Sequence, residues 1–301
     1  MTGALWALAA GAGFGLFQTL NRQAVRGMDV YVATFVQLAV STLVLAAIAV
    51  LTEDLSPLLT APVSAYINFI AAGVFHFLIG WTFLNASQKR IGAARTSPLI
   101  GTNPLFATII AAVILREFPS LLELAGIGII VAGAYLVSKE SGSSTVENGS
   151  APHTLSAILA ASWLGLSAAF FWAISPIFIR LGLQELPSPL LGVTVGVTAS
   201  AISYGFILLW QRQRWLSVPI SGEAWAYKLT AGLLVGLSTW MRWVALDLAP
   251  VAVVLALMMI SAPMVILLSP LVSGKQLERV TALLWVGTGL ILGGALLLTF
   301  I

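Results

Sequence analysis

The sequence contains no cysteine, only two histidines and few charged residues, and these shortages argue against a soluble protein, a disulfide-bonded protein and a zinc site. Of its 301 residues, 8% are charged and 59% are hydrophobic, whereas a soluble domain carries roughly 25% charged residues. Without cysteine the chain has no disulfide, no thiolate nucleophile and no cysteine-based metal site. We therefore expect a protein of the membrane that uses neither a metal nor another cofactor.

Long apolar runs predict an all-α polytopic membrane protein. A run of about 20 apolar residues spans roughly 30 Å of hydrocarbon as a helix. Ten such runs, bounded by charged residues, proline or glycine, form two groups of five. They are residues 4–24, 32–52, 64–86, 94–115 and 121–138, then 155–179, 189–210, 226–246, 250–272 and 279–300. We expect the first run to be a membrane span, since no basic segment marks it as a signal peptide.

Residues 139–154 separate the two groups and differ from them in composition. This segment is rich in Ser, Gly and Glu, so it lacks the apolar surface needed to fold alone. We predict a flexible linker here, between a first five-helix repeat at residues 1–138 and a second at residues 155–301.

The two groups of spans are related in sequence. A shift of 159 positions places Trp81 on Trp240 and Pro104 on Pro263, and both prolines lie in the fourth span of their group. Because each group has an odd number of spans, the second must enter the membrane from the opposite side. The sequence therefore predicts ten transmembrane helices arranged as two inverted five-helix repeats, an arrangement typical of transporters.

The distribution of Lys and Arg predicts that both termini lie outside the cytoplasm. Cytoplasmic loops carry the excess of basic residues, and the loops after the odd-numbered spans hold eleven of the fourteen. The eleven are Arg22, Arg26, Lys89, Arg90, Arg95, Lys139, Arg212, Arg214, Lys228, Lys275 and Arg279, and the other three are Arg116, Arg180 and Arg242. Their scatter along the chain also argues against a nucleic-acid partner.

A set of paired positions runs through both repeats. Each repeat opens with an aromatic and small pair and continues through two alanines to a proline in its fourth span, which a basic residue closes. The positions are Phe14-Gly15 and Trp172-Ala173, then Ala86, Ala93, Pro104 and Arg116-Glu117, echoed by Ala245, Ala252, Pro263 and Lys275-Gln276. The chain thereby resembles the drug/metabolite transporter superfamily, specifically its ten-helix EamA-type members. An acidic residue opening the fifth span is usual in that family; Glu117 fits, whereas Gln276 departs from the pattern.

This resemblance implies a multi-pass protein of the prokaryotic inner membrane. It also implies two EamA-like repeats, and in many family members both termini lie in the cytoplasm. We favour the opposite orientation for this chain, because the Lys and Arg bias holds in both of its halves.

The function we predict is secondary transport of a small polar or amphipathic metabolite such as an amino acid, with export as the expected direction. Two inverted repeats would alternate access to a midplane cavity. The expected partners are a small-molecule solute and membrane lipid, and the chain acts as a monomer or homodimer. A channel or an accessory membrane subunit is the alternative. An intramembrane enzyme would need a nucleophile with a base or paired carboxylates within the spans, and the spans offer neither.

Polar and aromatic side chains inside the spans are the candidates for substrate binding, because an unpaired polar group in hydrocarbon is costly. We select eight candidates: Gln18, His76, Trp81, Asn103, Trp172, Ser175, Trp240 and Arg242. Every Asp and Glu lies in a loop or at a span end, so proton coupling, if present, falls to His76 or to the solute.

Each candidate also has a packing interpretation. Gln18 shares a face with a GxxxG stripe that can serve close helix packing. His76 can bind solute or carry a proton, or it can be a neutral imidazole bonded to a neighbouring helix. Arg242 can neutralise a solute carboxylate, or it can pair with Asp247.

The prolines of the fourth spans offer one more possibility. A proline inside a helix has no N–H, so the carbonyls of Ile100 and Met259, four residues before Pro104 and Pro263, lose their usual partners and can face a cavity. A purely mechanical kink is the alternative. Asn103 directly precedes the first of these prolines.

Overall fold

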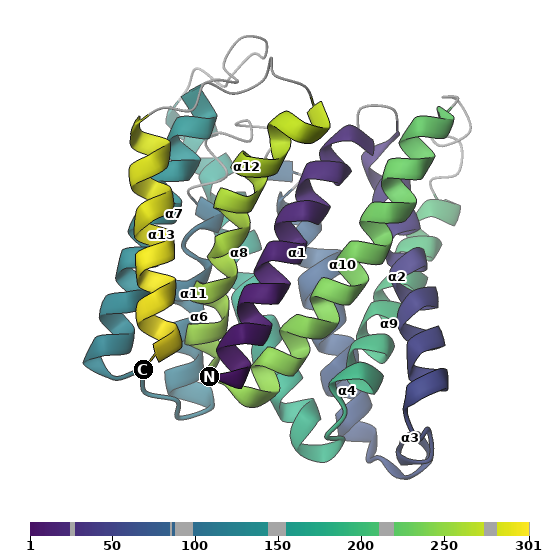
Figure 1. Ribbon diagram of the computed structural model, residues 1–301. Coiled ribbons are helices and arrows are strands. Elements are labelled where there is room, and N and C mark those ends of the chain that lie inside the picture. Colours follow the sequence, from purple (N-terminus) through teal and green to yellow (C-terminus); the bar gives the residue numbers. More distant parts are fainter. Residues whose placement is uncertain are drawn as a thin grey trace.

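The computed structural model describes residues 1–24, 28–84, 86–87, 99–143, 155–210, 220–273 and 282–300. Within these ranges all regular structure is helical. The long helices form one bundle, and both chain termini lie at the same end of it (Figure 1).

The first half of the chain contains six helices and one π-helical segment in the described ranges. They are α1 (Thr2–Ala24), α2 (Val30–Thr52), α3 (Pro57–Thr60), α4 (Val63–Gly73), the π-helix η1 (Val74–Gly80), α6 (Asn103–Ile114) and α7 (Leu121–Ser143). The second half follows a similar order. Its elements are α8 (Leu155–Glu185), α9 (Pro189–Trp210), α10 (Gly222–Leu248), α11 (Val251–Leu257), the 3-10 turn η3 (Met258–Ile260), α12 (Ser261–Ser273) and α13 (Ala282–Phe300).

Seven helices among the described residues are long and apolar enough to cross a membrane by length and composition. They are Thr2–Asn21, Tyr31–Thr52, Val63–Leu84, Ser162–Glu185, Pro189–Trp210, Gly222–Leu248 and Ala282–Phe300. Three shorter apolar helices accompany them: Asn103–Ile114, Leu121–Val137 and Val251–Val265. The sequence predicted ten spans, and the described residues show seven helices of that length and three shorter apolar helices.

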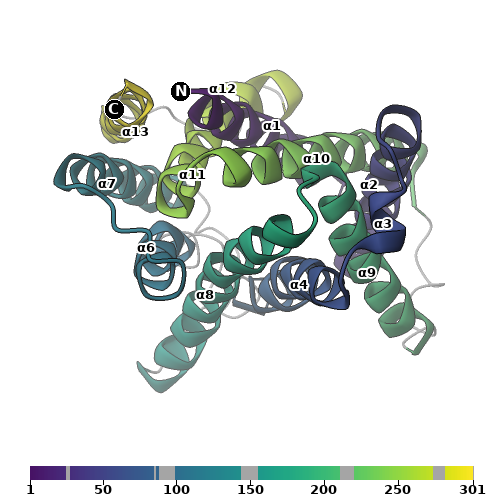
Figure 2. The same cartoon turned by 90° about the horizontal axis from the view of Figure 1, so that it is seen from below.

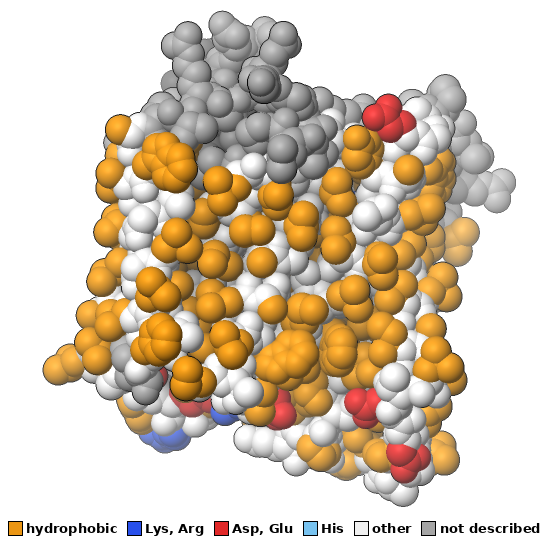
Figure 3. Space-filling model, viewed as in Figure 1, with side chains coloured by type: hydrophobic (Ala, Val, Ile, Leu, Met, Phe, Trp, Pro, Cys, Tyr) orange, Lys and Arg blue, Asp and Glu red, His pale blue; other side chains and the backbone are white. Residues whose placement is uncertain are grey.

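The outer surface of the bundle is apolar. Leu43, Leu51, Ile67 and Phe206 are each more than half exposed, and in Figure 3 hydrophobic side chains cover the middle of the face while charged side chains lie near its ends. An apolar patch of this extent is rare on a soluble monomer. The chain is therefore an integral multi-pass membrane protein.

Short polar side chains fix the starts of several helices. Asp29 Oδ1 accepts from the N–H groups of Tyr31 and Val32 at the start of α2, and Ser221 Oγ accepts from Ala224 N at the start of α10. These contacts satisfy N–H groups that a first helical turn leaves unpaired. The cap at Ser221 explains why α10 begins four residues before the predicted span.

Two predicted boundaries differ further from the structure. Helix α7 continues to Ser143, five residues into the predicted linker, and the rest of that linker lies outside the described residues. The predicted span at 94–115 has its first five residues outside the described ranges; Leu99 and Ile100 are helical, a turn follows, and helix α6 begins at Asn103.

Neither proline of the fourth spans follows a regular α-helical turn, and the free carbonyl predicted at Met259 is not found. Pro104 is the second residue of α6, where a missing N–H breaks no helical bond. Pro263 is the third residue of α12 and follows the 3-10 turn η3. The Met259 carbonyl accepts from the Ser261 N–H and is not left free. Both fourth spans are thus interrupted just before the proline rather than kinked at it.

Helices of the two halves interleave throughout the bundle. Helix α1 packs against α10 and α12, α8 packs against α4 and α6, α2 packs against α9 and α10, and α7 packs against α13. Figure 2 shows α8, α4, α9 and α10 around the lower end of the bundle.

One of these contacts brings two backbones together. A Cβ on Gly73 would lie 2.1 Å from the carbonyl oxygen of Gly196, so only glycine allows α4 and α9 to approach this closely. The close approach holds the start of η1 against α9.

Candidate functional site

Three of the eight predicted residues meet inside the bundle, and they come from both halves of the chain. The His76 ring of η1 stacks on the Trp172 ring of α8, with 5.6 Å between centroids and 26° between planes. Arg242 of α10 places Nη1 3.3 Å from His76 Nδ1. The Trp172 indole N–H also donates to the His76 backbone carbonyl over 2.9 Å.

A π-helical turn presents His76 to its partners. The segment Val74–Gly80 has the wider π-helical winding, a feature that recurs at functional sites. Gly80, the last residue of this segment, packs against the indole of Trp172. A Cβ at this position would lie 2.5 Å from Trp172 Cδ1 and Nε1. A residue larger than glycine at this position would push the indole away from His76.

Arg242 is a buried cation without a carboxylate partner in the described part of the chain. Its side chain is 1% exposed, and its Nε and Nη2 atoms have no hydrogen-bond partner. The sequence favoured pairing with Asp247, and that interpretation is wrong: the Asp247 side chain is exposed, and its backbone carbonyl accepts from Arg180. An isolated charge in so apolar a place is costly unless another group compensates it.

The contact with Arg242 assigns the protonation of the His76 ring. A guanidinium can only donate, so His76 Nδ1 is the acceptor and the proton of the neutral ring sits on Nε2. His76 is hydrogen-bonded to a neighbouring helix, as its packing interpretation expected, but the partner is a buried charge.

Gln18 lies on the inner side of α1 and keeps exposed surface there. Leu5 and Leu16 are exposed on the outer side of the same helix. At about 100° per residue, Gln18 lies roughly 160° around the axis from Leu16. Its face is shared with Gly11 and Gly15, which are buried against η3 and α12. The exposed surface of Gln18 therefore faces the bundle and not the lipid.

Four other candidates take part in helix packing. Asn103 Nδ2 donates to the Ala169 carbonyl of α8 over 3.0 Å, and Ser175 Oγ donates to the Ala72 carbonyl over 3.0 Å. The two remaining residues are tryptophans in aromatic contacts: Trp81 with Phe17 and Phe77, and Trp240 with Trp6. The structure does not bring these four into contact with His76 and Arg242.

A second buried cation was missed by the sequence reasoning. Lys228 was assigned to a cytoplasmic loop, but it lies inside α10 with 1% of its surface exposed. Its Nζ donates to Asn21 Oδ1 over 2.5 Å and to Gln37 Oε1 over 2.8 Å. Lys228 and Arg242 are fourteen residues apart, which places them on nearly the same helix face. This spacing is the sequence feature that could have indicated that Lys228 is buried.

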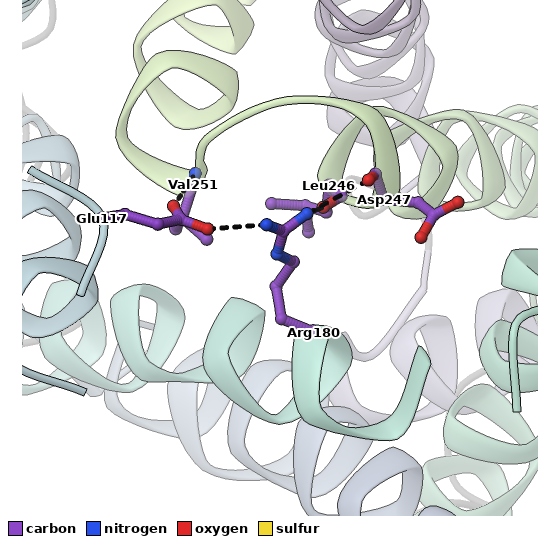
Figure 4. A network of polar contacts seen from close by, with 5 residues as sticks. All are labelled: Glu117, Arg180, Leu246, Asp247 and Val251. Carbon is purple, nitrogen blue, oxygen red and sulfur yellow. Dashed lines mark hydrogen bonds and ion pairs between the residues drawn. The ribbon is translucent and has the colours of Figure 1, made fainter. Parts of the chain in front are cut away.

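A charged network joins the two halves of the chain at the end of the bundle that holds the termini. Arg116 adopts a left-handed φ of 58° after α6, and this turn presents Glu117 to the second half of the chain. Glu117 accepts from Arg180 Nη2 over 2.7 Å and from the Val251 N–H over 2.9 Å. Arg180 Nη1 also donates to the Leu246 carbonyl over 2.7 Å (Figure 4).

Glu117→Gln should destabilise the folded protein by about 1–2 kcal/mol. The amide can still accept from Val251 N–H, but it loses the ionic attraction to Arg180, and both side chains are partly exposed, which limits the cost. Thermal unfolding in detergent measures the effect. Glu185→Gln is the control, since the exposed Glu185 accepts only from the Ser64 hydroxyl. Equal losses in both variants would contradict a special role for the Glu117 network.

Comparison with known proteins agrees with this architecture. Residues 1–139 match the model of the EamA-like transporter family, which confirms the resemblance seen in the sequence. A solved structure described only as a crystal structure of a protein superposes with a TM-score of 0.74, at 17% identity, over 97% of this chain and 96% of that one. That likeness shows a shared fold. No curated protein matches the chain.

Proposed function

We propose, from the match of residues 1–139 to the EamA-like transporter family, that this protein is a secondary transporter of a small polar or amphipathic metabolite. The observation that supports it is the meeting of His76, Trp172 and Arg242 inside an apolar bundle. These polar groups come from η1 in the first half and from α8 and α10 in the second. Movement between the halves would open and close the site they share.

Symmetric packing supports the inverted repeat that such a movement requires. If the first five spans correspond in order to the last five, α1 corresponds to α8 and α4 corresponds to α10. The contact of α1 with α10 should then have a counterpart between α8 and α4, and both contacts are present. In the same way α1 with α12 becomes α8 with α6, and α2 with α10 becomes α9 with α4. We therefore propose that the three shorter apolar helices belong to membrane-crossing segments, which gives ten crossings.

The orientation we propose places both termini outside the cytoplasm of a prokaryotic cell. Lys228 and Arg242 are buried in the bundle, so they are removed from the count of basic loop residues. Ten Lys and Arg residues then remain on the proposed cytoplasmic side and two on the other, which leaves the predicted orientation unchanged. We propose export as the direction of net transport and a monomer as the working unit, because one chain supplies the three residues that meet.

The Glu117 network suggests how one end of the path closes. Glu117 belongs to the first half, while Arg180 and Val251 belong to the second. These contacts must break when the halves separate at the end with the termini. We propose that they hold this end closed in the conformation described here.

Flux through liposomes that contain the purified protein tests the proposal. A transporter gives flux of a metabolite that saturates with concentration, in at least one direction. The panel of solutes should include amino acids and organic acids. Conductance that does not saturate would instead indicate a channel, and no flux across the panel in either direction would contradict the proposal.

A further inference from the structure

The interior of the bundle carries positive charge that the described chain does not balance. Arg242 and Lys228 are both buried on the inner face of α10. Lys228 is bonded to two side-chain amide oxygens, whereas Arg242 has one polar contact with the described residues, a nitrogen of His76. The acidic residues of the described ranges lie at helix ends or in connections. A guanidinium in this position lacks the counter charge that stabilises buried ions elsewhere.

The free polar atoms at this place are all donors. Arg242 Nε and Nη2 have no partner, and the neutral His76 ring has its remaining proton on Nε2. The Trp172 indole N–H is already used by the His76 carbonyl. A ligand that completes this arrangement must bring acceptor atoms and negative charge, which describes a carboxylate or a phosphate group.

The neighbouring Trp172 indole indicates the chemical character of the rest of such a ligand. Trp172 lies roughly opposite the exposed Trp163 around the axis of α8, so its side chain faces the bundle, and the residue is partly exposed. An aromatic ring of this kind contacts an apolar or planar group favourably. The pairing of a donor cluster with an indole therefore fits an anion that carries an organic body.

We propose that this site binds small organic anions, with the carboxylate or phosphate group on Arg242 and His76 and the organic body on Trp172. The inference rests on the transport function proposed above and names the class of its substrate. Arg242 is the residue that selects for charge.

The test compares probes of equal shape and different charge. Benzoate and benzamide differ in the ionic group, and phenyl phosphate supplies the second anion class. A ligand that binds only the folded state raises the unfolding temperature, so thermal unfolding in a neutral detergent reports binding. We expect benzoate or phenyl phosphate, but not benzamide, to raise the unfolding temperature of the unaltered protein.

Arg242→Gln should weaken the binding of the anionic probes by about tenfold or more, because it removes a charge-assisted hydrogen bond. Without a probe, this variant should unfold at the same or a higher temperature, since an uncompensated buried charge is gone. Arg242→Lys keeps the charge but not the fork of donors, and should bind with intermediate affinity. Lys228→Met is the control, because it removes the other buried cation of α10 and should leave the preference for anions unchanged.

Several results would overturn the inference. They are equal stabilisation by benzamide and benzoate, anion binding that survives in Arg242→Gln, or its loss in Lys228→Met but not in Arg242→Gln. The inference would also fail if chloride alone reproduced the effect of benzoate, because a resident counter-ion would then explain Arg242. The same holds for added phosphatidylglycerol, which would assign the site to a lipid headgroup.

The outcome separates the substrate class from transport itself. Saturable flux of neutral or cationic solutes that Arg242→Gln leaves unchanged would reject the anion site and retain the transporter. Anion binding that depends on Arg242, together with no flux of any solute, would retain the site and reject transport.

Discussion

Trp172→Ala is expected to lower kcat/KM for solute flux by about tenfold or more, while the protein stays folded. The substitution removes the ring that stacks on His76 and the indole N–H that binds the His76 carbonyl. A tenfold loss corresponds to about 1.4 kcal/mol of transition-state stabilisation, which is modest for the loss of both contacts. Initial rates of flux in liposomes measure the effect.

Two variants of the same helix control this prediction. Trp163 is 68% exposed on the opposite face of α8, so Trp163→Ala should leave flux within about twofold of the unaltered rate. Trp172→Phe retains an aromatic ring but has no N–H donor, and its rate should lie between the other two. If both alanine variants lose the same fraction of activity, Trp172 has no specific part in the transport path.

Lys228→Ala is expected to cost about 2–5 kcal/mol of folding free energy. The change leaves a cavity in the packing between α10, α1 and α2. It also leaves Asn21 Oδ1 and Gln37 Oε1 without their buried donor, and an unsatisfied buried acceptor is costly. Unfolding in detergent, followed by helix content against temperature or denaturant, measures the loss.

Lys228→Met separates volume from charge in that prediction. Methionine fills much of the lysine volume without a charge, and replacing a buried ion by an apolar group of similar size is often neutral or stabilising. We therefore expect Lys228→Met to recover most of the stability lost in Lys228→Ala. A methionine variant as unstable as the alanine variant would show that the ammonium group itself holds these helices together.

The positions of the helices could largely be predicted from the sequence, because they depend on local properties. Apolar length and the charged or breaking residues between runs located the span that became Pro189–Trp210, whose bounds agree with the prediction. Boundaries moved where a specific cap or turn intervened, as at Ser221 before α10. The interruption before Pro263 could not be distinguished from a kink, since both follow from the missing N–H.

The pairing of side chains could not be predicted, because it depends on which helices touch. The rule that charged residues lie in loops assigned Lys228 to a loop. It holds on average, and it fails where neighbouring helices supply partners such as Gln37. Sequence separation alone suggested the pair of Arg242 and Asp247. The structure places His76 beside Arg242 across 166 positions of sequence.

Polarity alone did not distinguish candidate binding groups from packing groups. Asn103 and Ser175 are polar and buried, as expected, but each donates to a backbone carbonyl of a neighbouring helix. Such bonds satisfy the side chain and join the helices. Arg242 differs because two of its donor nitrogens remain unpaired after the helices pack. Only the folded structure shows which donors are left unpaired.

We propose that the polar side chains of this bundle face an interior that water and solute can enter. Because the chain has no cysteine, a single introduced thiol tests it directly. Gln18→Cys and Leu16→Cys lie on opposite faces of α1 and both have exposed surface. We predict that a membrane-impermeant thiol reagent labels Gln18→Cys in liposomes and not Leu16→Cys. Labelling of Leu16→Cys with no labelling of Gln18→Cys would show that this interior is closed to water and solute.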